Sequence, residues 1–239
     1  MTGNTIPERQ NAPDMMRLLR ARSEIYRGAE KIQWAQLLFT VLLPVVSAVV
    51  GLAVPATRPF VAALSLALVL IDISLLDRSM KKRLKTAALV CEDFDCALLE
   101  MPWNRFATGK PAEPETIASA DRRWPEGDEK LKDWYPAAVG KAPLHLARVV
   151  CQRTNLWYDA KLRENYSIYL FIFAGAAVAG LVIAGLAVKL TFSDFVGTVL
   201  APATPILAWS IREAFKQRDA AEAQKTTRAE REAFGELVV

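Results

Sequence analysis

The stretch that decides the fold runs from Ser167 to Val188 and reads SIYLFIFAGAAVAGLVIAGLAV. It is 22 residues long and contains no charged residue. A helix that rises 1.5 Å per residue needs about 20 predominantly apolar residues to cross a hydrocarbon layer about 30 Å thick. The stretch is therefore long enough to be a transmembrane helix.

Three further stretches share this character. They cover 34–54, which is uncharged, 60–76, whose only charged residue is Asp72, and 195–211, which is uncharged but contains two prolines. In chain order the second stretch, 60–76, and the fourth, 195–211, are short, so they need local thinning of the bilayer or extension by flanking residues. We expect the first to be retained rather than cleaved, because it is too long for the core of a signal peptide.

Basic residues near the ends of these stretches predict their orientation, because lysine and arginine resist translocation. The loops inside the two predicted hairpins, 34–76 and 167–211, hold one basic residue each, Arg58 and Lys189. The flanking segments hold many more, namely Arg9, Arg17, Arg20, Arg22, Arg27, Lys31, Arg78, Lys81, Lys82, Arg83, Lys85, Arg212, Lys216 and Arg218. We therefore expect both termini and the segment between the hairpins to face the cytosol.

The resulting fold class is an all-α membrane protein in which four transmembrane helices, in two hairpins, flank a mainly helical cytosolic domain. The five predicted parts are a cytosolic amphipathic N-terminal helix in 1–33, hairpin 1 in 34–76 with spans 34–54 and 60–76, a cytosolic sensor or interaction domain in 77–166, hairpin 2 in 167–211 with spans 167–188 and 195–211, and a cytosolic helical tail in 212–239.

The charge of the chain does not indicate a general nucleic-acid surface. Its formal net charge is +4, the central 90 residues hold 16 basic and 14 acidic side chains, and the tail balances six against six. Basic residues beside a membrane more often meet anionic lipid headgroups, at roughly 1 kcal/mol each. We expect no binding of a DNA or RNA duplex.

Proline spacing predicts the helices outside the hairpins. The first, from Pro13 to Gln33, is amphipathic, and we expect it to pack on the cytosolic domain rather than on the membrane. A second helix covers 78–99, with Leu84, Ala88, Cys91, Phe94, Asp95 and Leu98 near one face. After a loop over 104–114 a short helix starts at Pro114, and from Pro143 no breaker occurs until well inside the third span.

Catalytic motifs are lacking. His145 is the only histidine, and the chain has no HExxH, no nucleophile elbow and no glycine-rich phosphate loop. Glu92, Asp93 and Asp95 are close in sequence, but a solvated helix face explains three carboxylates better than paired acid–base chemistry. The three cysteines match no metal or redox spacing, and the cytosol keeps thiols reduced. We expect a protein that is not an enzyme and holds no metal or cofactor.

An aromatic and polar cluster allows two interpretations. Planar side chains beside guanidinium groups stack on bases and hold phosphates, which predicts a ligand site. The same aromatic residues would also build the core of a small helical domain, with Asp159 and Arg163 as an internal ion pair. The candidate ligand residues are Trp103, Asn104, Arg105, Arg122, Arg123, Trp134, Tyr135, Arg153, Asn155, Asp159 and Arg163.

The spans themselves contain candidate packing or pore residues. Small residues at four-residue spacing let another helix approach closely, within one chain or between copies. Prolines kink membrane helices and free carbonyl groups, and an acidic residue inside a span marks a pore or pairs near the headgroups. These residues are Ala176, Gly180, Ala184, Pro44, Pro202, Pro205 and Asp72.

Several short motifs, in this order, carry a resemblance to a known family. They are EDFD at 92–95, LEMPWN at 99–104, LKDWYP at 131–136 and CQRTN at 151–155, followed by Asp159, Leu162 and Arg163. With two hairpins around a central domain of this size, the chain resembles the SMODS-associated four-transmembrane effectors over nearly its whole length.

The resemblance implies a role in bacterial anti-phage defence of the cyclic-oligonucleotide type, CBASS. A partner nucleotidyltransferase would make a cyclic di- or trinucleotide, and the effector, as a homo-oligomer in the inner membrane, would disrupt that membrane by pore formation or clustering and kill the infected cell. The alternative is a membrane-anchored interaction module that recruits a cytosolic partner and opens no pore.

Overall fold

The computed structural model describes residues 3–37, 54–57, 72–187, 191–196 and 201–237, with a few single positions between them. Across these ranges the chain is helical and contains no strand, which confirms the all-α prediction. Most of the predicted spans 34–54 and 60–76, including Pro44, lies outside the described residues.

The chain divides into two compact units. Unit 1 comprises Met1–Gln33, Asp77–Thr154 and Phe234–Val239, and unit 2 comprises Trp34–Leu76 and Asn155–Ala233. The helices of unit 1 are α1 (Ile6–Arg9), α2 (Pro13–Leu37), α5 (Asp77–Leu98), α6 (Arg105–Thr108), α7 (Pro114–Arg123), η4 (Ala137–Lys141) and the first turns of α8 (Leu144–Ala187).

Two buried clusters form the core of unit 1. The first gathers side chains from α1, α2, α5, α8 and the segment before α8, namely Ile6, Met15, Met16, Leu19, Phe94, Leu98, Leu99, Leu131, Tyr135, Val139, Ala147 and Cys151. The second joins α7 to α2 and α5 through Ala21, Ile25, Ala87, Val90, Ile117 and Ala120. Helix α2 therefore buries its apolar face in protein, as its amphipathic pattern predicts.

The predicted apolar face of α5 is correct only in its C-terminal half. Phe94 and Leu98 are buried, but Leu84 and Ala88 are exposed. At its middle α5 instead buries Ala87, one position away from the predicted face. The second cluster is small and lies beside α5, so the face that is buried there depends on where α7 packs rather than on the apolar pattern.

The C-terminus of α5 is closed by a Schellman motif. The Met101 N–H donates to the Cys96 carbonyl at 2.9 Å, and Glu100 between them has φ 52°. A left-handed residue after the last helical turn satisfies carbonyl groups that have no partner within the helix. Pro102 follows directly and prevents the helix from continuing.

Short helices follow α5. The loop predicted over 104–114 contains one helical turn, α6, because the Asn104 side chain accepts hydrogen bonds from the backbone N–H groups of Phe106 and Ala107 at 3.1 and 3.2 Å. Helix α7 begins at Pro114, as its sequence predicts, because proline fits the first helical turn.

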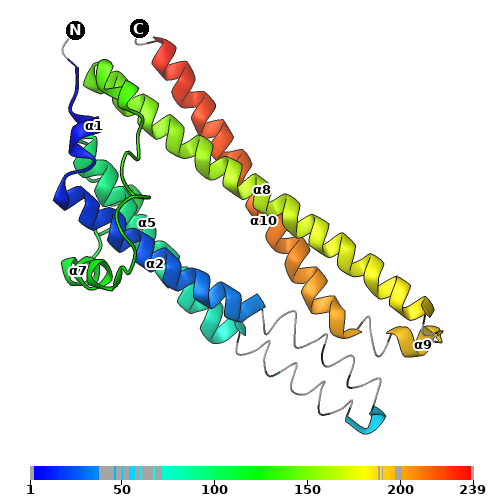
Figure 1. Cartoon of the computed structure of the whole chain (residues 1–239). Helices are drawn as coiled ribbons and strands as arrows, with labels where there is room; N and C mark the ends of the chain where they lie inside the picture. Colours follow the sequence, from blue (N-terminus) through cyan, green and yellow to red (C-terminus); the bar gives the residue numbers. More distant parts are fainter. Residues whose placement is uncertain are drawn as a thin grey trace. The chain divides into compact units, whose positions relative to one another are not determined.

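Helix α8 is a single helix of 44 residues, as the lack of a breaker after Pro143 predicts (Figure 1). Among the described residues it alone is long and apolar enough to cross a membrane. The described residues thus do not test the predicted arrangement of four spans. The fourth predicted span, 195–211, overlaps α10, which covers Ala201–Leu237, and residues 197–200 lie outside the described part.

In unit 2, α8 and α10 pack side by side and run antiparallel (Figure 1). Phe171 of α8 meets Phe215 of α10 edge to face, with ring centroids 5.3 Å apart. At the far end of α8, Gly185 lies against Phe195 of α9 (Phe192–Phe195), whose ring leaves no room for a side chain at position 185. The shorter η2 (Pro55–Thr57) and η3 (Asp72–Leu76) complete the described elements.

Candidate functional site

The core of unit 1 holds three helices that each lead to a predicted span. Met16 belongs to α2, which continues toward span 34–54, and Phe94 belongs to α5, which follows span 60–76. Cys151 belongs to α8, which contains span 167–188. Because these side chains share one close-packed cluster, a rearrangement of this core would act on all three helices together.

Arg148 ties α8 to the end of α5. Its guanidinium donates from Nε to the carbonyl of Leu99 at 2.5 Å and from Nη2 to the carbonyl of Glu100 at 2.7 Å. These carbonyls follow the last turn of α5, where backbone acceptors lack partners within the helix. A planar guanidinium satisfies both at once and fixes the two helices relative to each other.

The segment from Leu131 to Val139, here called the strap, packs against the same core. The side chain of Gln10 donates to the Tyr135 carbonyl at 3.0 Å and accepts from its backbone N–H at 2.7 Å. The Tyr135 hydroxyl donates to Asp95 of α5 at 2.9 Å. Tyr135 is only 1% exposed, so its ring acts as a core residue in this structure.

A cationic stack lies beside this strap. The Arg22 guanidinium lies over the Trp134 ring, 4.4 Å from its centroid, and 5.9 Å from the centroid of Tyr26. Its Nε is buried and has no hydrogen-bond partner among the described residues. Stacking of this kind stabilises the cation by about 0.5–2 kcal/mol and leaves the Nε–H of Arg22 available to an anion, while the guanidinium also hydrogen-bonds Cys91.

The three cysteines do not form a reactive site. Burial raises the pKa of the Cys96 thiol to about 11 and that of the Cys151 thiol to about 12, and it also raises the pKa of Cys91. Thiols with raised pKa values hold little thiolate at neutral pH, and all three cysteines are free. In the described residues no group of His, Cys, Asp or Glu side chains is arranged to hold a metal ion.

Helix α7 is anchored to α2 by a partly buried arginine. Arg20 donates to Asp121 at 2.6 Å and to Asp128 at 3.0 Å, with all three side chains about one third exposed or less. The hydrogen bond to Asp121 raises the pKa of Arg20 further. Arg123 reaches Ser119 at 2.7 Å and lies 3.9 Å from Glu24.

The predicted ligand residues are divided between the two units. Those in unit 1 include the exposed Arg105, Arg122, Arg123 and Arg153, whereas Tyr135 is in the core and Asn104 caps α6. Trp103 donates from Nε1 to the carbonyl of Gly109 at 2.8 Å. The remaining three, Asn155, Asp159 and Arg163, belong to unit 2.

The predicted ion pair between Asp159 and Arg163 is confirmed, with 2.9 Å between Nε and Oδ2. It belongs to a polar ladder that joins α8 to α10. Arg163 also donates to Gln217 at 3.0 Å, and Gln224 donates to Asp159. Lys225 bonds Glu164 at 3.1 Å, and its proximity lowers the pKa of that carboxyl.

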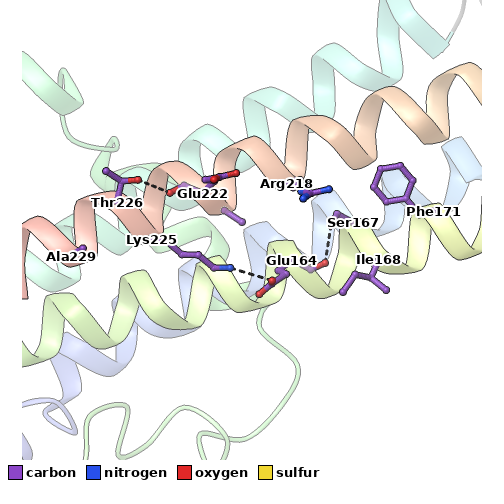
Figure 2. A pocket seen from close by; sticks show the side chains of 10 residues that line it. Glu164, Ser167, Ile168, Phe171, Arg218, Glu222, Lys225, Thr226 and Ala229 are labelled. Atoms are coloured by element: carbon purple, nitrogen blue, oxygen red, sulfur yellow. Dashed lines mark hydrogen bonds and ion pairs between the residues drawn. The ribbon is translucent and has the colours of Figure 1, made fainter.

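An open groove of about 710 Å³ lies between the two helices at this level (Figure 2). Its α8 side changes from the charged Glu164 to the apolar Ile168 and Phe171, while α10 contributes Arg218 and Lys225. The volume lies within the range of small-molecule sites, roughly 300–1,000 Å³. Charged and apolar walls together suit a ligand or segment that is itself amphipathic.

Sequence reasoning missed the contribution of α10. Its α8-facing positions recur at four- and three-residue steps, and they are small or polar: Ser210, Ala214, Gln217, Ala221, Gln224 and Arg228. This periodicity is present in the sequence, but it does not form an apolar stripe, because the positions are small or polar and the residues between them are largely charged. The step pattern alone could have identified the tail as a helix that packs on α8.

The candidate span residues are only partly described. Ala176 and Gly180 are exposed on α8. The side chains of Ala184, Pro202, Pro205 and Asp72 lie outside what the structure describes, although Asp72 begins η3 and the two prolines fall in α10. Their roles in packing or in a pore stay predictions.

Comparison with known proteins places the chain. Residues 4–236 match the SMODS-associating 4TM effector domain. The chain belongs to this family. As its description names four transmembrane segments in an effector domain, this SMODS-associating 4TM effector is a membrane protein, in agreement with the resemblance of its motifs.

A curated relative supports the assignment. The effector is similar to a probable CBASS effector molecule of Bacillus cereus (strain VD146), with 24% identity over 211 residues, which cover 86% of this chain and 71% of the relative. No solved structure matches the chain.

Proposed function

We propose that this SMODS-associating 4TM effector is the membrane-disrupting component of a cyclic-oligonucleotide anti-phage system. A cyclic di- or trinucleotide made by a partner nucleotidyltransferase acts on unit 1, and the response is disruption of the bacterial inner membrane by a pore or by clustering. Family membership and the name of the curated relative support the anti-phage role.

One observation carries the coupling step. The core of unit 1 holds the ends of α2, α5 and α8 in one cluster, and each of these helices leads to a predicted span. A ligand that changes the packing of this core would therefore bias three membrane segments simultaneously. The proposal places both termini and unit 1 in the cytosol, where the messenger is made.

Exposed arginines of unit 1 are the proposed messenger contacts. Arg122 and Arg123 end α7 and are both exposed, so a phosphodiester can reach both guanidinium groups, and at Arg123 it would compete with Ser119 and Glu24. The Arg22 and Trp134 stack provides a planar surface and a buried donor in the same unit. Tyr135 acts indirectly in this proposal, because its ring is in the core and positions the strap.

The energetic demand favours more than one subunit. Moving a two-state equilibrium from 1:99 to 99:1 takes about 5.5 kcal/mol of differential binding. A homo-oligomer with one messenger per subunit divides this demand among its sites. A small ligand can then switch the assembly without an unusually large affinity for either state.

Dye-loaded liposomes that contain the purified full chain test the proposal. We expect candidate cyclic di- and trinucleotides to trigger leakage with at least one messenger, and no leakage from protein-free liposomes. The double variant Arg122→Ala/Arg123→Ala should lose messenger binding and leakage while it still inserts. The matched control Lys130→Ala/Lys132→Ala removes two exposed positive charges from the same unit and should behave as the wild type.

The membrane-disruption proposal would be refuted if folded, inserted protein released no dye with any of the messengers tested. If the same protein also recovered a stoichiometric cytosolic partner in a pull-down, the alternative function, a membrane-anchored interaction module, would replace the membrane-disruption proposal. Equal loss of response in both double variants would show that net charge, and not the α7 arginines, governs binding.

A further inference from the structure

Helix α8 has an outward stripe that no described part of the chain covers. Six large apolar side chains lie on it, each between 60% and 73% exposed, namely Tyr158, Leu162, Tyr169, Ile172, Ile183 and Leu186. Asn165, Ala176 and Ala179 fill the intervening positions and are exposed too. The stripe begins in the charged part of α8 and continues through the predicted span.

The spacing of the stripe is that of a coiled coil. From Tyr158 to Leu186 its positions are separated by alternating steps of four and three residues, a 3.5-residue period sustained over four heptads. The positions on the opposite side of the helix, Ala160, Ser167 and Ala174, are buried. These are spaced along the side that faces α10, so the stripe points away from the partner helix already present.

Lipid alone does not suit the whole stripe. Its length, 28 residues at 1.5 Å, is about 42 Å, whereas the hydrocarbon layer is about 30 Å thick. Tyr158 lies nine residues before Ser167, where the uncharged stretch begins, or about 13 Å along the axis. This distance exceeds the roughly 5–8 Å of one interfacial layer, and four charged residues separate Tyr158 from the span, namely Asp159, Lys161, Arg163 and Glu164.

We propose that this stripe is the interface between copies of the effector, formed by α8 from each copy in parallel and in register. Copies inserted in the same orientation present α8 parallel, so under a twofold axis along the membrane normal each stripe residue meets its counterpart. Ala176 and Ala179 let the helices approach closely inside the bilayer. Asn165, the polar position of the repeat, fixes the register.

The inference deepens the proposed function, on which it relies only for the orientation of α8 in the membrane. It does not require a messenger. Of the predicted small-residue positions it assigns Ala176 to contacts between copies, and it extends the contact beyond the span to Leu162 and Tyr158.

Disulfide formation between single introduced cysteines tests the interface in the full chain, in native membranes treated with copper phenanthroline. Leu162→Cys and Ile172→Cys lie on the stripe. Trp157→Cys and Val178→Cys are matched controls, since Trp157 is 50% and Val178 46% exposed on the same helix but off the stripe. The wild-type chain supplies the background from its native thiols.

We expect about tenfold more covalent dimer at the stripe positions than at their matched controls, because a disulfide needs Cβ atoms within roughly 4 Å. Similar yields at all four positions, or monomer at all four, would overturn the proposal and indicate that lipid or another segment of the same chain covers α8. If a variant fails to insert, Tyr158→Cys provides a replacement on the stripe. Crosslinking without messenger-dependent leakage would leave the interface standing and refute the proposed function, and leakage without crosslinking would do the reverse.

Discussion

Replacing Arg148 with alanine removes the two hydrogen bonds that tie α8 to the end of α5. The carbonyl of Leu99 belongs to a fully buried residue, whereas Glu100 is exposed and its carbonyl can recruit water. A hydrogen bond from a charged donor contributes about 1.5–3 kcal/mol, and a buried acceptor left alone costs about 1–3 kcal/mol. Most of the loss therefore comes from Leu99.

The expected destabilisation is about 2–3 kcal/mol, taking the bond to Leu99 near its full value and the bond to Glu100 near 0.5 kcal/mol. For a cooperative unit of about 100 residues, 1 kcal/mol corresponds to roughly 4 °C in Tm, so Arg148→Ala should lower Tm by about 8–12 °C. Arg148→Lys retains the charge but not the planar fork, and it should lose about half as much.

Thermal unfolding of the detergent-solubilised chain, followed by tryptophan fluorescence, measures the effect. The control is Arg17→Ala, which removes an exposed arginine from α2 and should change stability by less than about 0.5 kcal/mol. In messenger-dependent leakage, Arg148→Ala should respond weakly below its Tm. If Arg148→Ala has the same Tm as the control, or if its leakage response is unchanged, the two hydrogen bonds of Arg148 do not couple α5 to α8 and the reasoning is refuted.

Two further predictions concern ionisable groups. Cys151, with its pKa raised to about 12, should resist iodoacetamide at pH 7.5 in the folded chain and react after denaturation, and rapid labelling of the native protein in a mass spectrum would contradict its burial. Because Lys225 lowers the pKa of Glu164, the pair stabilises the fold fully above the unfolded value near 4.5 and less as the pH falls through the folded value. Acidification from pH 6 to about 3.5 should therefore lower Tm more in the wild type than in Glu164→Gln, and equal losses would exclude the pair as a cause.

The starts of the helices could be predicted because proline determines them locally. Helices α2 and α7 begin at Pro13 and Pro114, and α8 begins directly after Pro143. The ion pair between Asp159 and Arg163 could also be predicted, since residues four apart on a helix are neighbours. These features depend on a few adjacent residues and on helix geometry alone.

The burial of individual aromatic residues could not be predicted in the same way. Tyr135 suits either a ligand site or a core, and only the packing of α1, α2 and α5 around it decides between them. The sequence predicted the end of α5 to within one residue, at Leu99 instead of Leu98, but it did not reveal the Schellman motif there, because such a motif usually contains glycine and here Glu100 adopts the left-handed conformation. Such features depend on tertiary contacts that leave no local pattern.

The unbroken course of α8 makes the chain sensitive to the phase of the helix as well as to its composition. A single residue inserted near Thr154 would rotate everything beyond it by about 100° and advance it by about 1.5 Å relative to the turns held in the core. Seven inserted residues would almost restore the angle, leaving about 20°, and lengthen the helix by about 10 Å. Relatives should therefore differ in the length of this segment by whole heptads or not at all.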